Sequence, residues 1–105
     1  DVQATLCELT ARSVALALRE HAADASDVVV CGGGALNSDL VRRLSEQLPG
    51  VRVGRSDAHG LDVMQVEAAA FAWLAWTHVQ RLAGNVPAVT GARGPRVLGA
   101  LYPAC

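Results

Sequence analysis

The sequence has 105 residues, which is room for one domain or for part of one. Nine Lys and Arg residues stand against ten acidic residues, so the net charge of −1 gives no basic face of the kind that nucleic-acid-binding proteins carry. No apolar run approaches the length of a membrane span, so neither nucleic acid nor a membrane is expected as a partner.

The first predicted element is a helix over residues 2–22. Its expected apolar face consists of Leu6, Leu9, Ser13, Val14, Leu16 and Leu18, which recur at three- and four-residue spacing. Asp1 suits the cap or first turn, and His21 is expected to be a solvated helix-end residue rather than a ligand. Because no methionine precedes Asp1 and Val2 already fits the helical register, we expect the chain to be a fragment of a longer protein.

A strand that runs into three glycines is the central feature of the sequence. The apolar run over residues 28–31 is typical of a strand buried on both faces of a parallel sheet. Gly32, Gly33 and Gly34 remove every Cβ from the following turn, so backbone N–H groups can approach a ligand. Asn37 or Ser38 can cap the next helix, whose amino end suits an anion. The stretch predicts a corner that binds nucleotide or phosphate.

An alternative interpretation of the glycines is purely structural, since a glycine-rich turn also lets a helix pack closely on a sheet. The stretch does not match G-x-G-x-x-G, and the chain contains no lysine for a G-x-x-x-x-G-K-[ST] loop. The usual dinucleotide fold and the P-loop enzymes are therefore disfavoured.

Residues 37–48 predict a second helix, and residues 51–53 predict a shorter, more exposed strand near a sheet edge. The helix has an expected buried stripe of Leu40, Val41, Leu44 and Leu48 and an expected solvated face of Arg42, Arg43, Glu46 and Gln47. Arg42 and Arg43 can reach a phosphate, but a solvated charge pair is the favoured interpretation. Pro49–Gly50 is expected to end the helix.

A polar loop over residues 55–62 precedes the third predicted helix, which runs from Asp62 to about Leu82. Asp57 and His59 lack a third ligand, so surface roles are favoured over metal binding or acid–base chemistry. Asp62 and Gln65 have the spacing of a capping box. From Val66 to Trp76 the helix is apolar on all sides except at Glu67, so we expect it to be buried.

Glu67 allows two interpretations. It is either a cap-region acid hydrogen-bonded to a neighbouring loop or a carboxylate presented into a cleft, and the residues alone favour neither. Turns are expected at Gly84–Asn85 and over residues 90–95, and residues 97–102 predict a short strand or an extended cover. Cys7, Cys31 and Cys105 read as reduced thiols of a cytoplasmic protein.

Five short motifs occur in a recognisable order. They are A-T-L and L-T-A within residues 4–11, C-G-G-G-A with Asn37, E-A, F-A and L-A within residues 67–75, N-V-P with T-G-A within residues 85–92, and L-G with Y-P within residues 98–103. In this order they resemble the carboxyl-terminal part of the 1,6-anhydro-N-acetylmuramic acid kinases. That family belongs to the sugar kinase, Hsp70 and actin superfamily.

The resemblance implies an α/β fold with the order helix-strand-helix-strand-helix and then a loop-rich tail. Residues 1–105 would form the carboxyl-terminal portion of the second RNase H-like (actin-like ATPase) domain of a larger kinase. The implied enzyme opens the anhydro ring with water and phosphorylates the sugar at its 6-position, using ATP and Mg²⁺, in peptidoglycan recycling. Whether the whole enzyme forms a homodimer is left open.

Site residues follow from the resemblance. Gly32, Gly33 and Gly34 would lie against the nucleotide, Asn37 would cap the helix and approach the nucleotide, and Glu67 would face the sugar. The catalytic aspartate and the phosphate-gripping loop are expected upstream, so no catalytic or metal-binding residue is assigned here, and Asp27, Asp57 and Asp62 are not substituted for them. This chain alone is expected to be inactive, because one wall of a cleft cannot align water, sugar and phosphate.

Two alternatives remain open. One is a stand-alone nucleotide- or partner-binding module without chemistry, which a cooperative, monomeric, well-behaved chain would favour. The other is a different sugar or acyl-phosphate kinase of the same superfamily, against which Glu67 argues.

Overall fold

The computed structural model describes residues 1–104 and forms two compact units, residues 1–66 and a unit that begins at Glu67. The elements of the first unit are α1 (Val2–His21), β1 (Asp27–Val30), the 3-10 helix η1 (Gly33–Leu36), α2 (Ser38–Gln47), β2 (Arg52–Arg55) and the 3-10 helix η2 (Ser56–His59). Helix α3 (Val66–Val79) follows, and α4 (Pro87–Thr90) is a single turn. The predicted α/β class and the order helix-strand-helix-strand-helix are confirmed.

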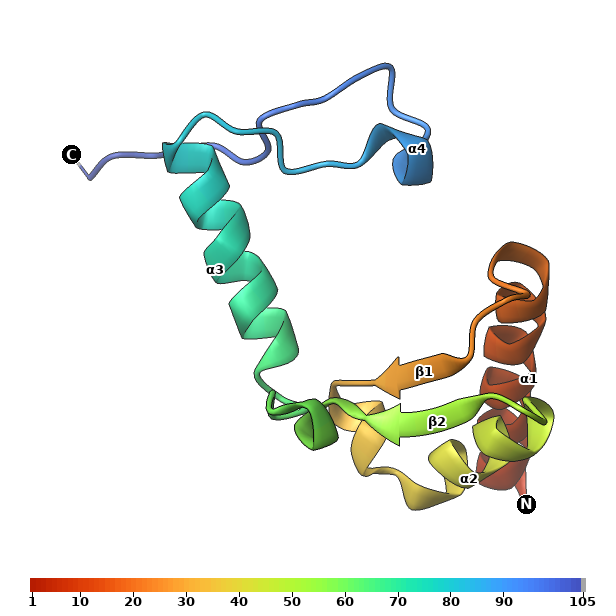
Figure 1. Ribbon diagram of the computed structural model, residues 1–105. Coiled ribbons are helices and arrows are strands. Elements are labelled where there is room, and N and C mark those ends of the chain that lie inside the picture. Colours follow the sequence, from red (N-terminus) through yellow and green to blue (C-terminus); the bar gives the residue numbers. More distant parts are fainter. Residues whose placement is uncertain (105) are drawn as a thin grey trace. The chain divides into compact units, whose positions relative to one another are not determined.

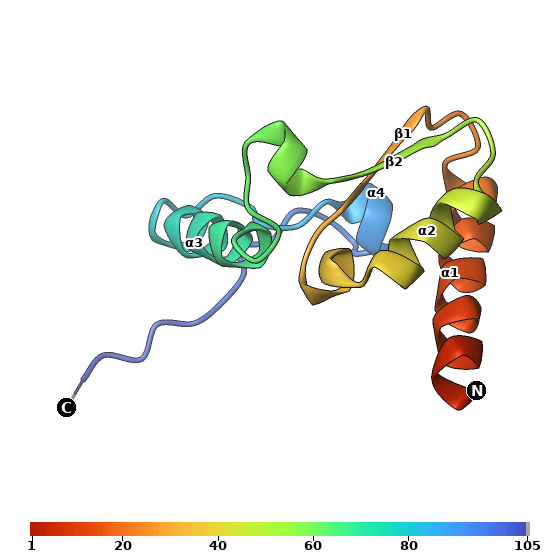
Figure 2. The same ribbon diagram turned by 90° about the horizontal axis from the view of Figure 1, so that it is seen from below.

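The two strands of the first unit pair in parallel. Val28 lies opposite Val53, and Val30 lies opposite Arg55. Both arrows in Figure 1 therefore point toward the same edge. Figure 2 shows α1 and α2 on one side of the two strands. Because α2 connects the strands, the first unit contains the crossover that a parallel pair requires.

The core of the first unit lies between α1, α2 and one face of the sheet. Ala15 packs with Leu44 of α2 and with Leu48, which directly follows that helix. The half-buried residues against them are Leu18, Val28, Val30, Val51 and Val53. The expected face of α1 is confirmed at Leu18 but is otherwise wrong, since Leu6, Leu9 and Leu16 are exposed and the buried residues of the helix are Ala11 and Ala15. The small alanine side chains let α2 approach closely.

Strand β1 is not buried on both faces, which corrects the expectation from its apolar run. Its burial alternates, and Val29 is 48% exposed between the half-buried Val28 and Val30. The reason is that α1 and α2 pack on the Val28 face only. The second strand begins and ends slightly later than predicted, at Arg52 and Arg55.

The caps of the first unit agree with the sequence. The Asp1 carboxylate accepts a hydrogen bond from the Gln3 N–H at 3.1 Å at the start of α1. The Asn37 side-chain oxygen accepts a hydrogen bond from the Leu40 N–H at 3.1 Å at the start of α2. Helix α2 ends at Gln47, and Gly50 takes a φ of 85° in the turn that follows.

Helix α3 differs from its prediction in start, end and burial. It begins at Val66 instead of Asp62. It ends at Val79 instead of Leu82, and Arg81 just beyond this end adopts a φ of 58°, which is not helical. Its aromatic side chains are exposed, with Trp76 at 54%. Within the second unit the tail approaches α3 where Leu98 and Leu74 both lie beside Gly84.

The tail after α3 is an extended cover, not a strand, in the described residues. The Asn85 side chain closes it by accepting a hydrogen bond from the Arg96 N–H at 2.6 Å and donating one to the Gly94 carbonyl at 3.2 Å. The His78 ring bonds the Leu98 carbonyl at 2.8 Å.

Two smaller expectations concern the cysteines and the membrane. Cys7 and Cys31 are free, and Cys105 lies outside the described residues. Across residues 1–104, no helix has the length and apolar character needed to cross a membrane.

The core analysis predicts a large difference between two leucines. Leu44→Ala should lower the free energy of unfolding by about 2–4 kcal/mol, because Leu44 is 5% exposed and its removal leaves a cavity. Leu16→Ala is the matched control, since Leu16 is 61% exposed and the change should cost less than about 0.5 kcal/mol. Urea unfolding followed by circular dichroism measures both, and equal losses would contradict the core assigned here.

Candidate functional site

Two turns meet at the carboxyl edge of the sheet. The glycine turn, Gly32–Gly34, follows β1, and η2 follows β2 directly at Ser56. In open α/β sheets, ligands bind just beyond the carboxyl ends of the strands. The glycine turn therefore has the position within its unit that the sequence predicted.

The three glycines have different environments. Gly32 adopts a φ of 74°, which favours glycine for backbone reasons alone. A Cβ on Gly33 would meet no atom within 4 Å, whereas a Cβ on Gly34 would lie 3.5 Å from the Leu40 side chain. A contact at that distance is an ordinary van der Waals contact, so packing does not require glycine at Gly34. The backbone explains Gly32, and neither backbone nor packing explains Gly33 or Gly34.

The three glycines also differ in the hydrogen bonds that their backbone N–H groups make. The Gly32 N–H donates to the Val63 carbonyl at 2.7 Å, so it is not available to a ligand. The Gly32 and Gly34 carbonyls accept from Ala35 and Asn37, which closes η1. Within residues 1–104, no hydrogen bond involves the N–H of Gly33 or Gly34. These two donors are the ones that the turn offers to a bound group.

A hollow adjoins the glycine turn. It is lined by Ala35, Leu36, Ser38, Val41, Arg42 and Arg55. Its volume of about 340 Å³ is at the low end for small-molecule pockets, which are roughly 300–1,000 Å³. The space suffices for part of a nucleotide. The two guanidinium groups on its wall are already paired with carboxylates, Arg42 with Asp39 and Glu46 and Arg55 with Asp57.

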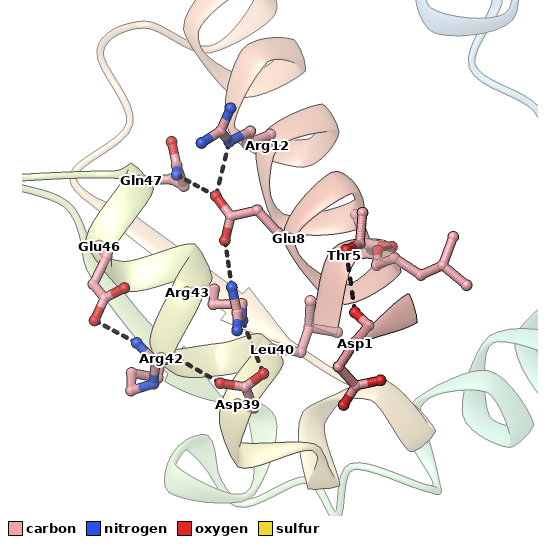
Figure 3. Close-up of polar contacts among 12 residues, drawn as sticks. Asp1, Thr5, Glu8, Arg12, Asp39, Leu40, Arg42, Arg43, Glu46 and Gln47 are labelled. Carbon is pink, nitrogen blue, oxygen red and sulfur yellow. Dashed lines mark hydrogen bonds and ion pairs between the residues drawn. The ribbon is translucent and has the colours of Figure 1, made fainter. Parts of the chain in front are cut away.

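The arginine pair of α2 does not form one solvated face. Figure 3 shows Arg43 between Glu8 of α1 and Asp39, at 2.7 and 2.8 Å. Arg42 is more exposed and pairs with Asp39 at 2.5 Å and with Glu46 at 2.6 Å. Gln47, expected to be solvated, also donates to Glu8, at 3.0 Å. Arg43 and Gln47 therefore hold α2 against α1, which corrects the predicted solvated face.

These contacts shift the ionisation of the acids. Hydrogen bonds from Arg43 and Arg42 lower the pKa of Asp39 to about 2, and those from Arg43 and Arg12 lower the pKa of Glu8. At the amino end of β1, the Asp27 carboxylate accepts two hydrogen bonds from the Arg52 guanidinium, and this bidentate pair lowers the pKa of Asp27 to about 2. All three acids are thus bound to arginines as carboxylates, which suits structural ion pairs.

Asp57 and His59 of η2 lie on the surface, whereas Ser56 is buried. Asp57 pairs with Arg55 at 2.6 Å, and this hydrogen bond lowers the pKa of Asp57. His59 is exposed. In the part of the chain that the structure describes, no three His, Cys, Asp or Glu side chains are grouped to hold a metal ion.

Glu67 is the second residue of α3 and is exposed. Residues 1–104 provide no hydrogen bond or ion pair to its carboxylate, so the cap-region interpretation gains no contact. The glycine turn and Glu67 belong to different compact units.

Sequence reasoning missed the segment that leads into α3. Asp62 does not begin a helix. Its carboxylate accepts from the Met64 N–H at 2.8 Å, and its carbonyl accepts from the Gln65 N–H at 3.0 Å, which makes a turn. Val63 within this turn is 3% exposed. The available signal was the apolar Val63 directly after the polar loop, next to an aspartate that favours turns.

Comparison with known proteins gives a consistent family. A family model described as anhydro-N-acetylmuramic acid kinase matches residues 1–104. Proteins of that name from Variovorax paradoxus (strain S110) and Cupriavidus pinatubonensis are 59% and 58% identical to this chain, over 99% and 98% of it. One from Chromobacterium violaceum is 55% identical over 98% of it. The chain covers 28% of each of these relatives, so it spans little more than a quarter of their length.

The ion pairs of Figure 3 predict acid sensitivity. The pKa of Asp39 is about 2 in the folded chain and 3.8 ordinarily, so its contribution to stability is complete above pH 3.8 and is lost as the pH falls toward 2. Asp39→Asn should therefore flatten the decline of the unfolding free energy between about pH 4 and pH 2. Urea titrations at a series of pH values test this, and an unchanged slope in the variant would contradict it.

Proposed function

Because this chain belongs to the anhydro-N-acetylmuramic acid kinase family, we propose that it forms the carboxyl-terminal portion of a larger kinase of this kind. Its unit of parallel strands with α1 and α2 would be part of the second RNase H-like domain, of the actin-like ATPase type. The parallel β1–β2 pair with its crossover helix supports this assignment. The free Cys7 and Cys31 agree with a cytoplasmic enzyme.

The proposed activity of the whole enzyme is ATP-dependent. Water opens the 1,6-anhydro ring of anhydro-N-acetylmuramic acid, and the γ-phosphoryl group of ATP is transferred to the 6-oxygen in peptidoglycan recycling. The attacking water and its activating aspartate belong to other parts of the kinase. This chain contributes residues that bind and orient the two substrates.

The nucleotide contact rests on one observation, the open glycine turn. Gly33 and Gly34 carry N–H groups without an internal partner, and a Cβ at Gly33 would enter empty space. Gly32 sets the backbone of the turn through its φ of 74°. Asn37 uses its side chain to cap α2, so its approach to the nucleotide would be through its remaining polar atoms. Backbone donors at this edge match a nucleotide bound beyond the strand ends.

Glu67 is proposed to bind the sugar. Its carboxylate is exposed and makes no hydrogen bond within the described residues, so it has acceptor capacity for sugar hydroxyl groups. A carboxylate that accepts such bonds orients the sugar ring for attack, without itself exchanging a proton with water.

Mg²⁺ would neutralise the ATP phosphates. The carboxylates of Asp39 on α2 and Asp57 on η2 are paired with arginines. We therefore assign to this chain contact with the nucleotide and expect the protein ligands to Mg²⁺ in the rest of the kinase.

Gly33→Ala tests the nucleotide contact in the full-length kinase. The added Cβ meets no protein atom, so folding should be unchanged, but it occupies the space assigned to the nucleotide. The KM for ATP should rise by about tenfold, equivalent to ~1.4 kcal/mol, with little change in the KM for the sugar. Gly54→Ala is the matched control, because a Cβ there also meets nothing within 4 Å but lies within β2. An unchanged KM for ATP in the Gly33 variant would exclude the contact.

Glu67→Gln tests the sugar contact. Loss of a charged acceptor should lower kcat/KM for the anhydrosugar by about 10–100-fold, since such hydrogen bonds contribute about 1.5–3 kcal/mol. The KM for ATP should stay near its original value. Glu46→Gln on α2 is the control, because Glu46 is exposed and, within residues 1–104, its ion pair is with Arg42. Equal effects of the two changes in an ADP-release assay would argue against a sugar-binding role for Glu67.

A further inference from the structure

We propose that the outer face of α1 is an interface within the whole kinase, on which an apolar surface from the part of that kinase preceding residue 1 packs. The inference rests on the proposed assignment of this chain to the carboxyl-terminal portion of a larger enzyme. It concerns a leucine stripe that consists of Val2, Leu6, Leu9 and Leu16.

The leucine stripe lies on the side of α1 that faces away from α2. On the inner side of the helix Ala11 and Ala15 are buried, and Ala15 packs against Leu44 of α2. Each residue turns an α-helix by about 100°, so Leu9 lies about 200° around the helix from Ala11, and Leu6 about 180° from Ala15. In the described residues the four side chains of the stripe are 56–75% exposed. The packing of α1 on α2 therefore leaves this face uncovered.

The spacing of the stripe is typical of a helix that packs on a second surface. Val2, Leu9 and Leu16 recur every seven residues, and Leu6 lies four residues after Val2 and three before Leu9. Such i, i+4, i+7 spacing places apolar side chains in one row along a helix. Contiguous exposed apolar surface of this kind marks an interaction site on a protein.

Hydroxyl groups beside the stripe are already hydrogen-bonded within α1. The Thr10 hydroxyl donates to the Leu6 carbonyl at 2.9 Å, and the Ser13 hydroxyl donates to the Leu9 carbonyl at 2.8 Å. A surface that covers the stripe therefore leaves neither hydroxyl hydrogen without an acceptor. Because an unpaired buried donor is what makes burial of a hydroxyl costly, this face suits a dry, apolar cover.

The cover is assigned to the same polypeptide because most of the kinase lies outside this chain. The chain spans 28% of the length of its relatives from Variovorax paradoxus and Cupriavidus pinatubonensis. Leu6 and Leu9 belong to the A-T-L and L-T-A motifs through which the chain resembles these kinases. A surface tethered in the same polypeptide acts at an effective concentration that reaches about millimolar, well above that of a second copy in dilute solution. The rest of the kinase therefore outcompetes a second copy for this face.

Site-specific photocrosslinking in the full-length kinase identifies the cover. With p-benzoylphenylalanine in place of Leu9, irradiation should join α1 to a peptide from the part of the same polypeptide that precedes residue 1, as read by mass spectrometry. The matched control carries the same group in place of Arg12. That side chain is 66% exposed and pairs with Glu8, outside the stripe, so the control should give little of this crosslink.

A smaller change provides a second measurement in the full-length kinase. The thiol of Leu9→Cys should react with a maleimide at least about tenfold more slowly than that of Arg12→Cys, because reaction requires the interface to open. Tandem mass spectrometry distinguishes these thiols from the native Cys7. The protection should not depend on enzyme concentration, since the cover belongs to the same polypeptide. In residues 1–104 by themselves Leu16 meets solvent, so Leu16→Ala becomes costly only where the rest of the kinase is present.

The outcomes distinguish the possible covers of the stripe. Crosslinks to preceding peptides, with protection that is independent of concentration, support the inference. Crosslinks between two polypeptides, or protection that grows with concentration, would assign the stripe to a second copy and overturn it. Crosslinks to residues 67–104 would overturn it as well, and so would rapid labelling of Leu9→Cys. The kinase assignment is tested separately by ADP release from the unmodified enzyme, and its failure would leave the crosslinks unchanged.

Discussion

The parallel pairing of β1 and β2 determines where everything in the first unit lies. With Val28 opposite Val53, both strands end at one edge, and the glycine turn and η2 emerge there together. A parallel pair needs a crossover, and α2 supplies it while covering the Val28 face with α1. An antiparallel pairing would place the turn and η2 at opposite ends of the strands. The carboxyl-edge geometry of the proposed site thus follows from strand direction.

Local patterns predicted the strands, the caps of α1 and α2 and the order of elements, because these depend on neighbours in the sequence. Asn37 capping α2 and Gly50 in the turn after that helix are examples. What failed was the choice of buried face. On α1 the leucine pattern was more apolar than the alanine pattern, yet Ala11 and Ala15 are the buried residues. Close approach of α2 decides this, and hydrophobic periodicity contains no information about how near a partner helix comes.

The predicted solvated face of α2 was wrong for a similar reason, because a partner far away in the sequence decides it. Arg43 belongs to a polar stretch of α2 and therefore looks solvated in the sequence. In the structure it pairs with Glu8, 35 residues earlier, and so links α2 to α1. The exposed aromatic residues of α3 show the converse case. Their composition predicts burial, but burial requires a covering surface, and the described residues leave Phe71, Trp73 and Trp76 more than half exposed. Long-range partners, which a single sequence does not display, settle both questions.

The glycine turn shows how a sequence motif divides into separate physical tasks. Gly32 is required by a positive φ and gives its N–H to Val63, whereas neither backbone conformation nor packing requires glycine at Gly33 or Gly34. An alanine at Gly33 would meet no atom within 4 Å, and one at Gly34 would make an ordinary contact with Leu40. The ligand hypothesis therefore narrows from three glycines to Gly33 and Gly34 with their two N–H donors. At these two positions a nucleotide contact requires glycine, and the purely structural alternative does not.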